Sequence, residues 1–246
     1  MPALPSLPDA KVKIDFGNVG NFGNLGRDMI RLVVFDLDGT LIDSRRDLAD
    51  ATNALIEEYG GTRLSTDRVS AMVGEGAAVL VRRALAAAGL DPQTPGALDR
   101  FLEHYAERLT VFTRPYAGIP ETLATFRDRG YGLAVLTNKP QQPTERILDL
   151  LDLSPFFTDV VGGDSAAGRK PDPAGLLEIA RRANAAPAET MMVGDSRIDF
   201  ETGRRAGTAI CLARYGFGFR AEEMEFAGDE LFIDRPGDLL PLVIGG

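Results

Sequence analysis

The chain has 246 residues, of which 27 are lysine or arginine and 36 are aspartate or glutamate, giving a formal net charge of -9. This acidic balance argues against nucleic acid as a partner, because no basic face is available to neutralise phosphates. No run of the sequence approaches the roughly 18 apolar residues of a membrane span. The hydrophobic content of 44% is enough for one large α/β domain, or for a domain with a smaller insert.

Two rare residue types narrow the chemistry. Cys211 is the single cysteine, so we expect no internal disulfide and a cytoplasmic location. His104 is the single histidine and lies in a helical pattern with charged neighbours, which predicts a surface or half-buried position. A His-rich zinc site is therefore excluded, and so is a Ser-His-Asp triad if His104 is remote from the site. A bound metal ion must be held by oxygen, which fits Mg²⁺.

Residues 1–28 are rich in Pro, Gly and Asn and show no sustained periodicity. We expect this extension to be disordered or loosely attached. It has neither the basic start nor the apolar centre of a signal peptide. Met29 precedes the first predicted strand, so a physically complete domain can begin there.

The first predicted strand is Leu32–Phe35, which leads into Asp36-Leu37-Asp38-Gly39-Thr40. Its β-branched and aromatic content is typical of a strand buried on both faces, and Gly39 ends it. Residues two apart on an extended chain point the same way, so Asp36 and Asp38 should lean into the crevice beyond the strand, where open α/β sheets bind ligands. The alternative is that the two aspartates lie in a solvated surface turn, but such turns do not usually follow a strand of the buried type. Two carboxylates this close require a cation or a shared proton.

The segment from residue 45 to residue 114 has a helical pattern throughout and no predicted strand. Its three apolar stripes are Leu48, Thr52, Leu55 and Ile56; then Val79, Leu80, Ala84, Leu85 and Ala88; then Leu98, Phe101, Leu102, Tyr105 and Leu109. A simple crossover between two strands is far shorter than this segment. We therefore predict an inserted helical domain over residues 45–114, with the remaining core formed by residues 29–44 and 115–246.

Strands and helices alternate after the insert. The predicted strands are Gly132–Leu136, Asp159–Val161, Met191–Val193, Ala209–Leu212 and Leu231–Ile233. The predicted helices are Ile119–Arg129, Pro143–Leu150, Pro173–Asn184 and Ile198–Ala206. Such alternation predicts a parallel sheet with helices on both faces.

Polar residues follow two of these strands where the crevice is expected. Thr137 and Asn138 offer a hydroxyl, an amide and backbone N-H groups that suit phosphate oxygens, although capping of the next helix is an equal alternative. Asp195 follows an apolar strand and Gly194, and is a candidate metal ligand. Asp199 lies one helical turn later and is placed to orient Asp195 or to hold a metal-bound water. Helix capping is the alternative for both aspartates.

The loop Gly168-Arg169-Lys170-Pro171-Asp172-Pro173 holds two cations just before a helix. Lys170 in such a loop can neutralise a phosphate and the Asp36 carboxylate together. An ordinary solvated lysine at a turn is the alternative reading of this loop taken alone.

Together, these four motifs make the chain similar to haloacid dehalogenase superfamily phosphatases with a helical cap. The superfamily pattern is Asp-x-Asp-x-Thr, a strand-end Ser or Thr, a Lys, and an acidic pair after Gly, and the resemblance covers Leu32 to about Leu240. Finer features resemble phosphoglycolate phosphatases: Thr137-Asn138-Lys139-Pro140, Arg169-Lys170-Pro171-Asp172-Pro173, Val193-Gly194-Asp195-Ser196-Arg197 and Met72-Val73-Gly74-Glu75-Gly76. One departure is Ile198, where those enzymes commonly have Asn.

The resemblance implies a Rossmann-like three-layer core with an all-helical cap domain, and a two-step hydrolysis of a phosphate ester. Asp36 would be the nucleophile that forms an aspartyl-phosphate, and Asp38 the general acid and base. Mg²⁺ would be bound by the Asp36 side chain, the Asp38 backbone carbonyl and Asp195. The resemblance further implies that Thr137, Asn138 and Lys170 hold phosphate oxygens, with Lys170 also catalytic, and that Thr40, Ser196 and Asp199 support the ligands.

Substrate and partners are expectations of the same kind. We expect a small phosphorylated metabolite, with 2-phosphoglycolate favoured, and a monomer or homodimer. In the cap, Arg45 or Arg83 can pair a substrate carboxylate, and Glu75 lies in a flexible polar loop; solvated helix faces are the alternative for both arginines. Rival activities are hydrolysis of another small phosphate ester or pyrophosphate, a phosphomutase, a non-catalytic phospho-receiver and a dehalogenase. The presence of Asp38 counts against the last two.

Overall fold

The computed structural model describes residues 30–166 and 168–244, so the prediction for residues 1–28 lies outside the described part. A six-stranded parallel sheet forms the centre of the molecule, in the order β5-β4-β1-β6-β7-β8. The strands are β1 (Leu32–Phe35), β4 (Gly132–Leu136), β5 (Asp159–Val161), β6 (Thr190–Gly194), β7 (Ala209–Ala213) and β8 (Leu231–Ile233).

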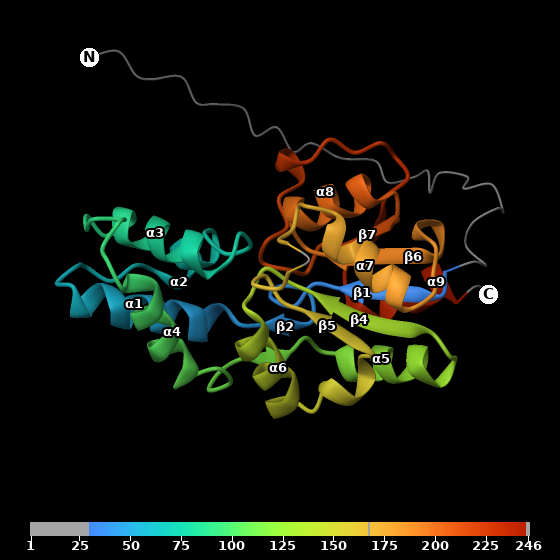
Figure 1. Cartoon of the computed structure of the whole chain (residues 1–246), viewed down its shortest axis with the longest axis horizontal. Coiled ribbons are helices and arrows are strands. Elements are labelled where there is room, and N and C mark those ends of the chain that lie inside the picture. Colours follow the sequence, from blue (N-terminus) through green and yellow to red (C-terminus); the bar gives the residue numbers. More distant parts are fainter. Residues whose placement is uncertain (1–29, 167, 245–246) are drawn as a thin grey trace, which may run out of the picture.

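Helices cover both faces of this sheet (Figure 1). On one face lie α5 (Ile119–Asp128), α6 (Gln141–Leu150) and α9 (Leu239–Val243), and on the other lie α7 (Ala174–Arg182) and α8 (Arg197–Ala206). Alternate residues of each strand point to opposite faces, so Val33 and Phe35 pack with the first set, whereas Leu32 and Val34 pack with the second. The predicted three-layer α/β fold is confirmed.

Four helices lie between residues 45 and 106 of the chain and beside one end of the sheet in space (Figure 1). They are α1 (Arg45–Glu58), α2 (Thr66–Ser70), α3 (Ala77–Ala87) and α4 (Ala97–Ala106). The apolar stripes lie largely inward: Leu55, Leu85 and Phe101 are at most 1% exposed. Leu98 is an exception, because it is 36% exposed. α2 was not expected, since five residues are too few to show a helical period.

The chain enters and leaves this helical unit through a short antiparallel pair. β2 (Ile42–Asp43) pairs with β3 (Arg114–Pro115). Asp47, in the first turn of α1, holds the same junction: its Oδ2 accepts from the Phe112 and Thr113 N-H groups at 2.9 and 2.7 Å and from the Thr113 hydroxyl at 2.7 Å. The start of α1 is thereby fixed to the segment that leads into β3.

Substituting Asp47 with alanine should lower the free energy of unfolding by roughly 2–5 kcal/mol, because three donors at the junction lose a charged acceptor. Asp50→Ala is the matched control: it lies on the same helix, its side chain is 33% exposed, and its partners are Arg46 and Arg63 on the surface. Denaturant unfolding of both variants measures the difference. Equal midpoints for the two would show that the Asp47 contacts contribute little.

Candidate active site

The candidate site lies at the carboxyl ends of three neighbouring strands. Phe35 of β1 pairs with Val135 of β4 and with Val193 of β6. Residues that follow these partners therefore emerge at the same edge of the sheet, which brings together segments more than 150 positions apart in the chain. This register, rather than any local feature, places Asp36 beside Asp195.

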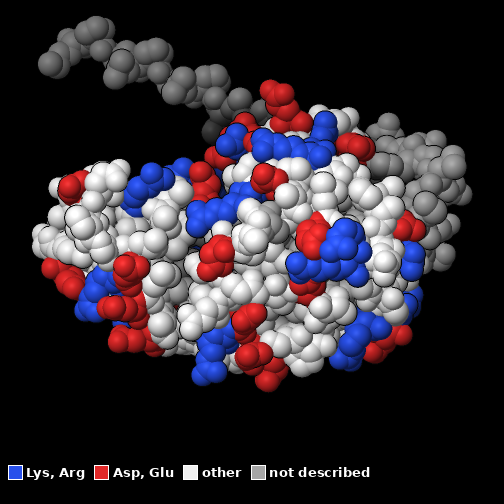
Figure 2. Space-filling view, in the orientation of Figure 1, with Lys and Arg blue, Asp and Glu red and all other residues white. Residues whose placement is uncertain are grey.

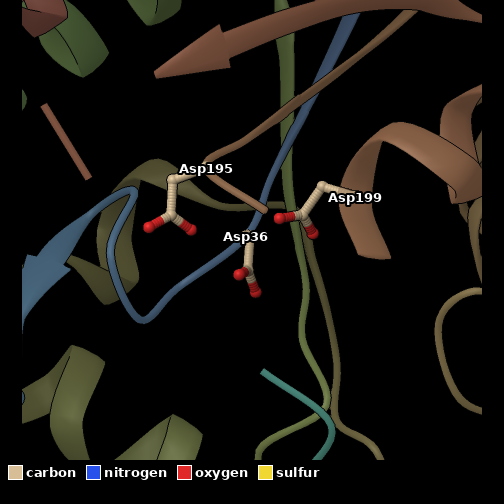
Figure 3. A group of neighbouring side chains, drawn as sticks. All are labelled: Asp36, Asp195 and Asp199. Atoms are coloured by element: carbon tan, nitrogen blue, oxygen red, sulfur yellow. The ribbon is translucent and has the colours of Figure 1, made fainter. Parts of the chain in front are cut away.

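Asp36, Asp195 and Asp199 form a buried carboxylate cluster (Figure 3). One carboxylate oxygen from each lies within 4.8 Å of the other two. Asp36 follows β1, Asp195 follows β6 and Asp199 belongs to the first turn of α8. Burial, followed by the charge of Asp199, raises the pKa of Asp36 to about 6 and holds that of Asp195 well above its usual range. Three carboxylates this close therefore favour either a shared proton or a bound cation.

Backbone packs closely around Asp195. Gly39 has φ +90, and a Cβ there would fall 2.0 Å from Asp195 Oδ2. The peptide that contains the Asp38 carbonyl therefore runs beside this carboxylate. From the other side, the Gly218 N-H donates to Asp195 Oδ2 at 2.7 Å. Asp36 Oδ1 is buried, and the Lys170 amine is 2.7 Å from it. The atoms that could ligate a metal ion here are carboxylate oxygens, together with the Asp38 carbonyl, and this is the ligand set that Mg²⁺ prefers.

Lys170 compensates part of the negative charge. Its Nζ lies 2.7 Å from Asp36 Oδ1 and donates to Asp199 Oδ1 at 2.6 Å, and its side chain is 2% exposed. Burial opposes the charged amine, but Asp199 and Asp36 outweigh burial and raise the pKa of Lys170. The other oxygen of Asp199 accepts from the Ser196 N-H and hydroxyl. Asp199 thus orients Lys170, a contact that the sequence did not indicate.

Asp38 has two partners that sequence reasoning missed. The Nζ of Lys139 donates to both Asp38 oxygens, at 2.8 and 3.0 Å, and the Ser44 hydroxyl donates to Asp38 Oδ1. Burial opposes the charged amine here too, but Asp38 and Tyr105 together outweigh burial and raise the pKa of Lys139. A signal existed: Lys139 follows Thr137 by two residues, the same spacing that places Asp36 and Asp38 on one side.

Thr137 lines a small cavity together with Asp36 and Asp38. Asn138 lies beside it, but both of its amide hydrogens are engaged: Nδ2 donates to the carbonyls of Gly74 and Lys170, each at 2.9 Å. Asn138 therefore joins the loop of the helical unit to the loop of Lys170. Its role in holding phosphate stays a prediction.

The remaining candidates lie farther out. Glu75 and Arg83 pair with each other at 2.6 Å and line a second cavity of about 540 Å³, which Ile198 also lines. This cavity opens at the surface between α3 and α8, where acidic and basic side chains are intermixed (Figure 2). Arg45 pairs with Asp43 at 2.6 Å, so both arginines already have acidic partners. Thr40 is buried, and its carbonyl accepts from the Tyr215 hydroxyl at 2.9 Å.

Comparison with known proteins identifies the family. The model of the haloacid dehalogenase-like hydrolases matches residues 33–213. The chain is 35% identical to the phosphoglycolate phosphatase of Aquifex aeolicus (strain VF5), over 87% of this chain and 97% of that protein. It is 39% identical to the phosphoglycolate phosphatase of Rhodospirillum rubrum, over 85% and 94% respectively. A crystal structure of a predicted phosphoglycolate phosphatase from Haemophilus somnus 129pt superposes with a TM-score of 0.81 at 30% identity, covering 88% of this chain and 99% of that one.

The chain therefore belongs to the haloacid dehalogenase-like hydrolase family. Within that family it groups with proteins named phosphoglycolate phosphatase, so it is a hydrolase of the phosphoric monoester class. Among the helices in the described part of the chain, none has the length and apolar character needed to cross a bilayer.

Proposed function

We propose that the protein is a Mg²⁺-dependent phosphatase that hydrolyses 2-phosphoglycolate through a phosphorylated Asp36. The observation that carries this proposal is the arrangement at the sheet edge: a buried carboxylate cluster, Lys170 within ion-pair distance of Asp36, and a second carboxylate, Asp38, lining the same small cavity. The names of the relatives support the choice of substrate.

The chain's own residues have separable tasks. Asp36 attacks phosphorus, the P-O bond to the alcohol breaks, and the phosphoryl group is held on the carboxylate until water removes it. Asp38 gives its proton to the departing alkoxide and then takes one from the attacking water. Lys170 and Thr137 supply donors to the phosphoryl oxygens while charge spreads over them. Lys170 also offsets repulsion between Asp36 and the incoming phosphate.

The residues present fit a divalent cation. Asp36, Asp195 and the Asp38 carbonyl would hold Mg²⁺, and the ion would supply positive charge between the nucleophile and the phosphate when bound. We further propose that α1 to α4 act as a cap that covers the crevice and excludes water from it. Their contact with the core through Asn138 and Gly74 supports this role.

The experiment that tests the proposal is phosphate release from a panel of small phosphates, each assayed with Mg²⁺ and with a chelator. The panel contains 2-phosphoglycolate, hexose phosphates, nucleotides and pyrophosphate. We expect Mg²⁺-dependent release with the highest kcat/KM for 2-phosphoglycolate. A better turnover of another ester would overturn the substrate, and isomerised hexose phosphate without free phosphate would indicate a mutase.

Metal binding should also change stability in a pH-dependent way. In the metal-free protein the pKa of Asp36 is raised from 3.8 to about 6, so the folded state binds the extra proton more tightly than the unfolded chain. The resulting stabilisation is present at low pH and is lost as pH rises through this window. Mg²⁺ competes with that proton, so the melting temperature should rise more on adding Mg²⁺ at about pH 7.5 than at about pH 5. Scanning calorimetry checks this, and an equal rise at both pH values would contradict it.

A further inference from the structure

Lys139 is a second buried cation of the site, and the hydrolysis described above does not use it. Its side chain is 5% exposed, and its Nζ contacts Asp38 on one side and lies 4.7 Å from the centre of the Tyr105 ring on the other. Lys139 follows β4 of the core, whereas Tyr105 belongs to α4 of the helical unit. This lysine therefore sits where the two parts of the molecule meet.

The cavity at this point is small and has a polar side and an apolar side. Its polar lining comes from the core, including Asp36, Asp38 and Lys139. Its apolar lining comes mainly from the helical unit: Leu48, Val73, Ala77, Leu80, Phe101 and Leu102. Lys139 is the sole lysine or arginine among the described residues that line it. The volume is about 50 Å³. The organic part of a substrate that enters it must therefore be small.

Tyr105 contributes an unused donor to this space. Its hydroxyl is buried and close to the Lys139 amine, but it donates to no acceptor among the described residues. Its ring stacks on Phe101 at a centroid distance of 5.8 Å. Burial raises the pKa of Tyr105 to about 12, so the hydroxyl keeps its proton at neutral pH. A buried O-H without an acceptor is unfavourable, and an anion next to Lys139 would supply the missing acceptor.

We infer that Lys139 and Tyr105 bind a carboxylate carried by the alcohol part of the substrate. This inference rests on the proposed function and names the groups that make it selective. Beyond its ester oxygen, 2-phosphoglycolate carries only a CH₂ group and a carboxylate, four non-hydrogen atoms in all. A single CH₂ group separates this carboxylate from the ester oxygen that Asp38 protonates. The carboxylate therefore lies close to Asp38, which is the residue that Lys139 contacts.

The competing explanation is that Lys139 only positions Asp38. The two explanations differ in one measurable way. A lysine that only holds the acid and base affects every phosphate ester equally, whereas a lysine that binds the substrate carboxylate affects esters that carry one. The comparison therefore needs two substrates of the same shape. The neutral amide 2-phosphoglycolamide has nearly the same shape as 2-phosphoglycolate, but an uncharged NH₂ group replaces one carboxylate oxygen.

The experiment measures kcat/KM for both substrates in the wild type and in Lys139→Met, Lys139→Arg and Tyr105→Phe. We expect the wild type to prefer the carboxylate, and Lys139→Met to reduce that preference by about 10- to 100-fold, the range for hydrogen bonds to charged groups. Lys139→Arg keeps the charge and should keep most of the preference. Tyr105→Phe keeps the stacked ring and should reduce the preference several-fold, through KM.

Each outcome has one meaning. If Lys139→Met slows both substrates equally, the lysine acts through Asp38 alone and the inference is overturned. If Tyr105→Phe keeps the full preference for the carboxylate, the Tyr105 hydroxyl does not bind the substrate and that half of the inference is overturned. This variant still tests the inference if Lys139→Met does not fold. If the wild type hydrolyses 2-phosphoglycolate no better than unrelated esters, the proposed substrate is wrong. If the wild type prefers the carboxylate and Lys139→Met keeps that preference, only the inference about Lys139 is wrong.

Discussion

Replacement of Asp36 by asparagine should abolish phosphate release, with a loss of roughly 10⁴-fold or more in kcat. An amide cannot form the acyl phosphate, and none of the neighbouring carboxylates can take its place, since Asp199 already accepts from Lys170 and Ser196 and Asp38 from Lys139 and Ser44. In the proposed mechanism Asp36 is the nucleophile, which, unlike a binding group, has no partial substitute. The assay is single-turnover phosphate release from 2-phosphoglycolate with Mg²⁺ present.

The same variant should remain folded. Asparagine has nearly the shape of aspartate, and burial disfavours the charge of Asp36, raising its pKa. We therefore expect a melting temperature at least equal to that of the wild type in a chelator. Asp128→Asn is the matched control, because its side chain is 69% exposed and it lies on α5, away from the crevice. Acid-quenched wild type should carry covalent phosphate on Asp36; release at the wild-type rate by Asp36→Asn would end the proposed mechanism.

Replacement of Lys170 by methionine should lower both activity and stability. The amine lies between Asp36 and Asp199, and all three side chains are buried. Removing one partner of a buried ion pair leaves an uncompensated charge, which typically costs about 3–5 kcal/mol. For a chain of this length that corresponds to a fall of roughly 10 °C in melting temperature. Activity should fall by roughly 10³-fold, because a donor to the phosphoryl group is lost as well.

A double variant separates these two effects. In Lys170→Met with Asp199→Asn, one of the two uncompensated carboxylates is gone, so much of the stability should return. Activity should not return, since the cation beside Asp36 is still missing. Thermal melts in a chelator and phosphate release with Mg²⁺ measure the two quantities independently. A double variant that melts no higher than Lys170→Met would show that the stability loss has another cause, such as poor packing of methionine.

Local patterns were sufficient for the sheet and its helices. The apolar run Leu32–Phe35 is β1, and the alternation of strands and helices predicted a parallel sheet. Both predictions were possible because a buried strand and an amphipathic helix each show their pattern within a few residues. Errors lie at the ends of elements. α6 begins at Gln141 rather than Pro143, since proline is tolerated in the first turn of a helix. α7 ends at Arg182 rather than Asn184, where Asn184 has a positive φ of 50.

The sequence by itself determined which residue types stand at which strand ends, and so indicated that Asp36, Asp38, Thr137, Lys170 and Asp195 face one crevice. Only the tertiary structure decided how these groups pair. Lys139 and Asp38 are 101 positions apart, and Tyr105 reaches them from a different part of the fold. A contact of that kind leaves no periodic trace in the chain, because it depends on how strands register and where helices pack rather than on neighbouring residues.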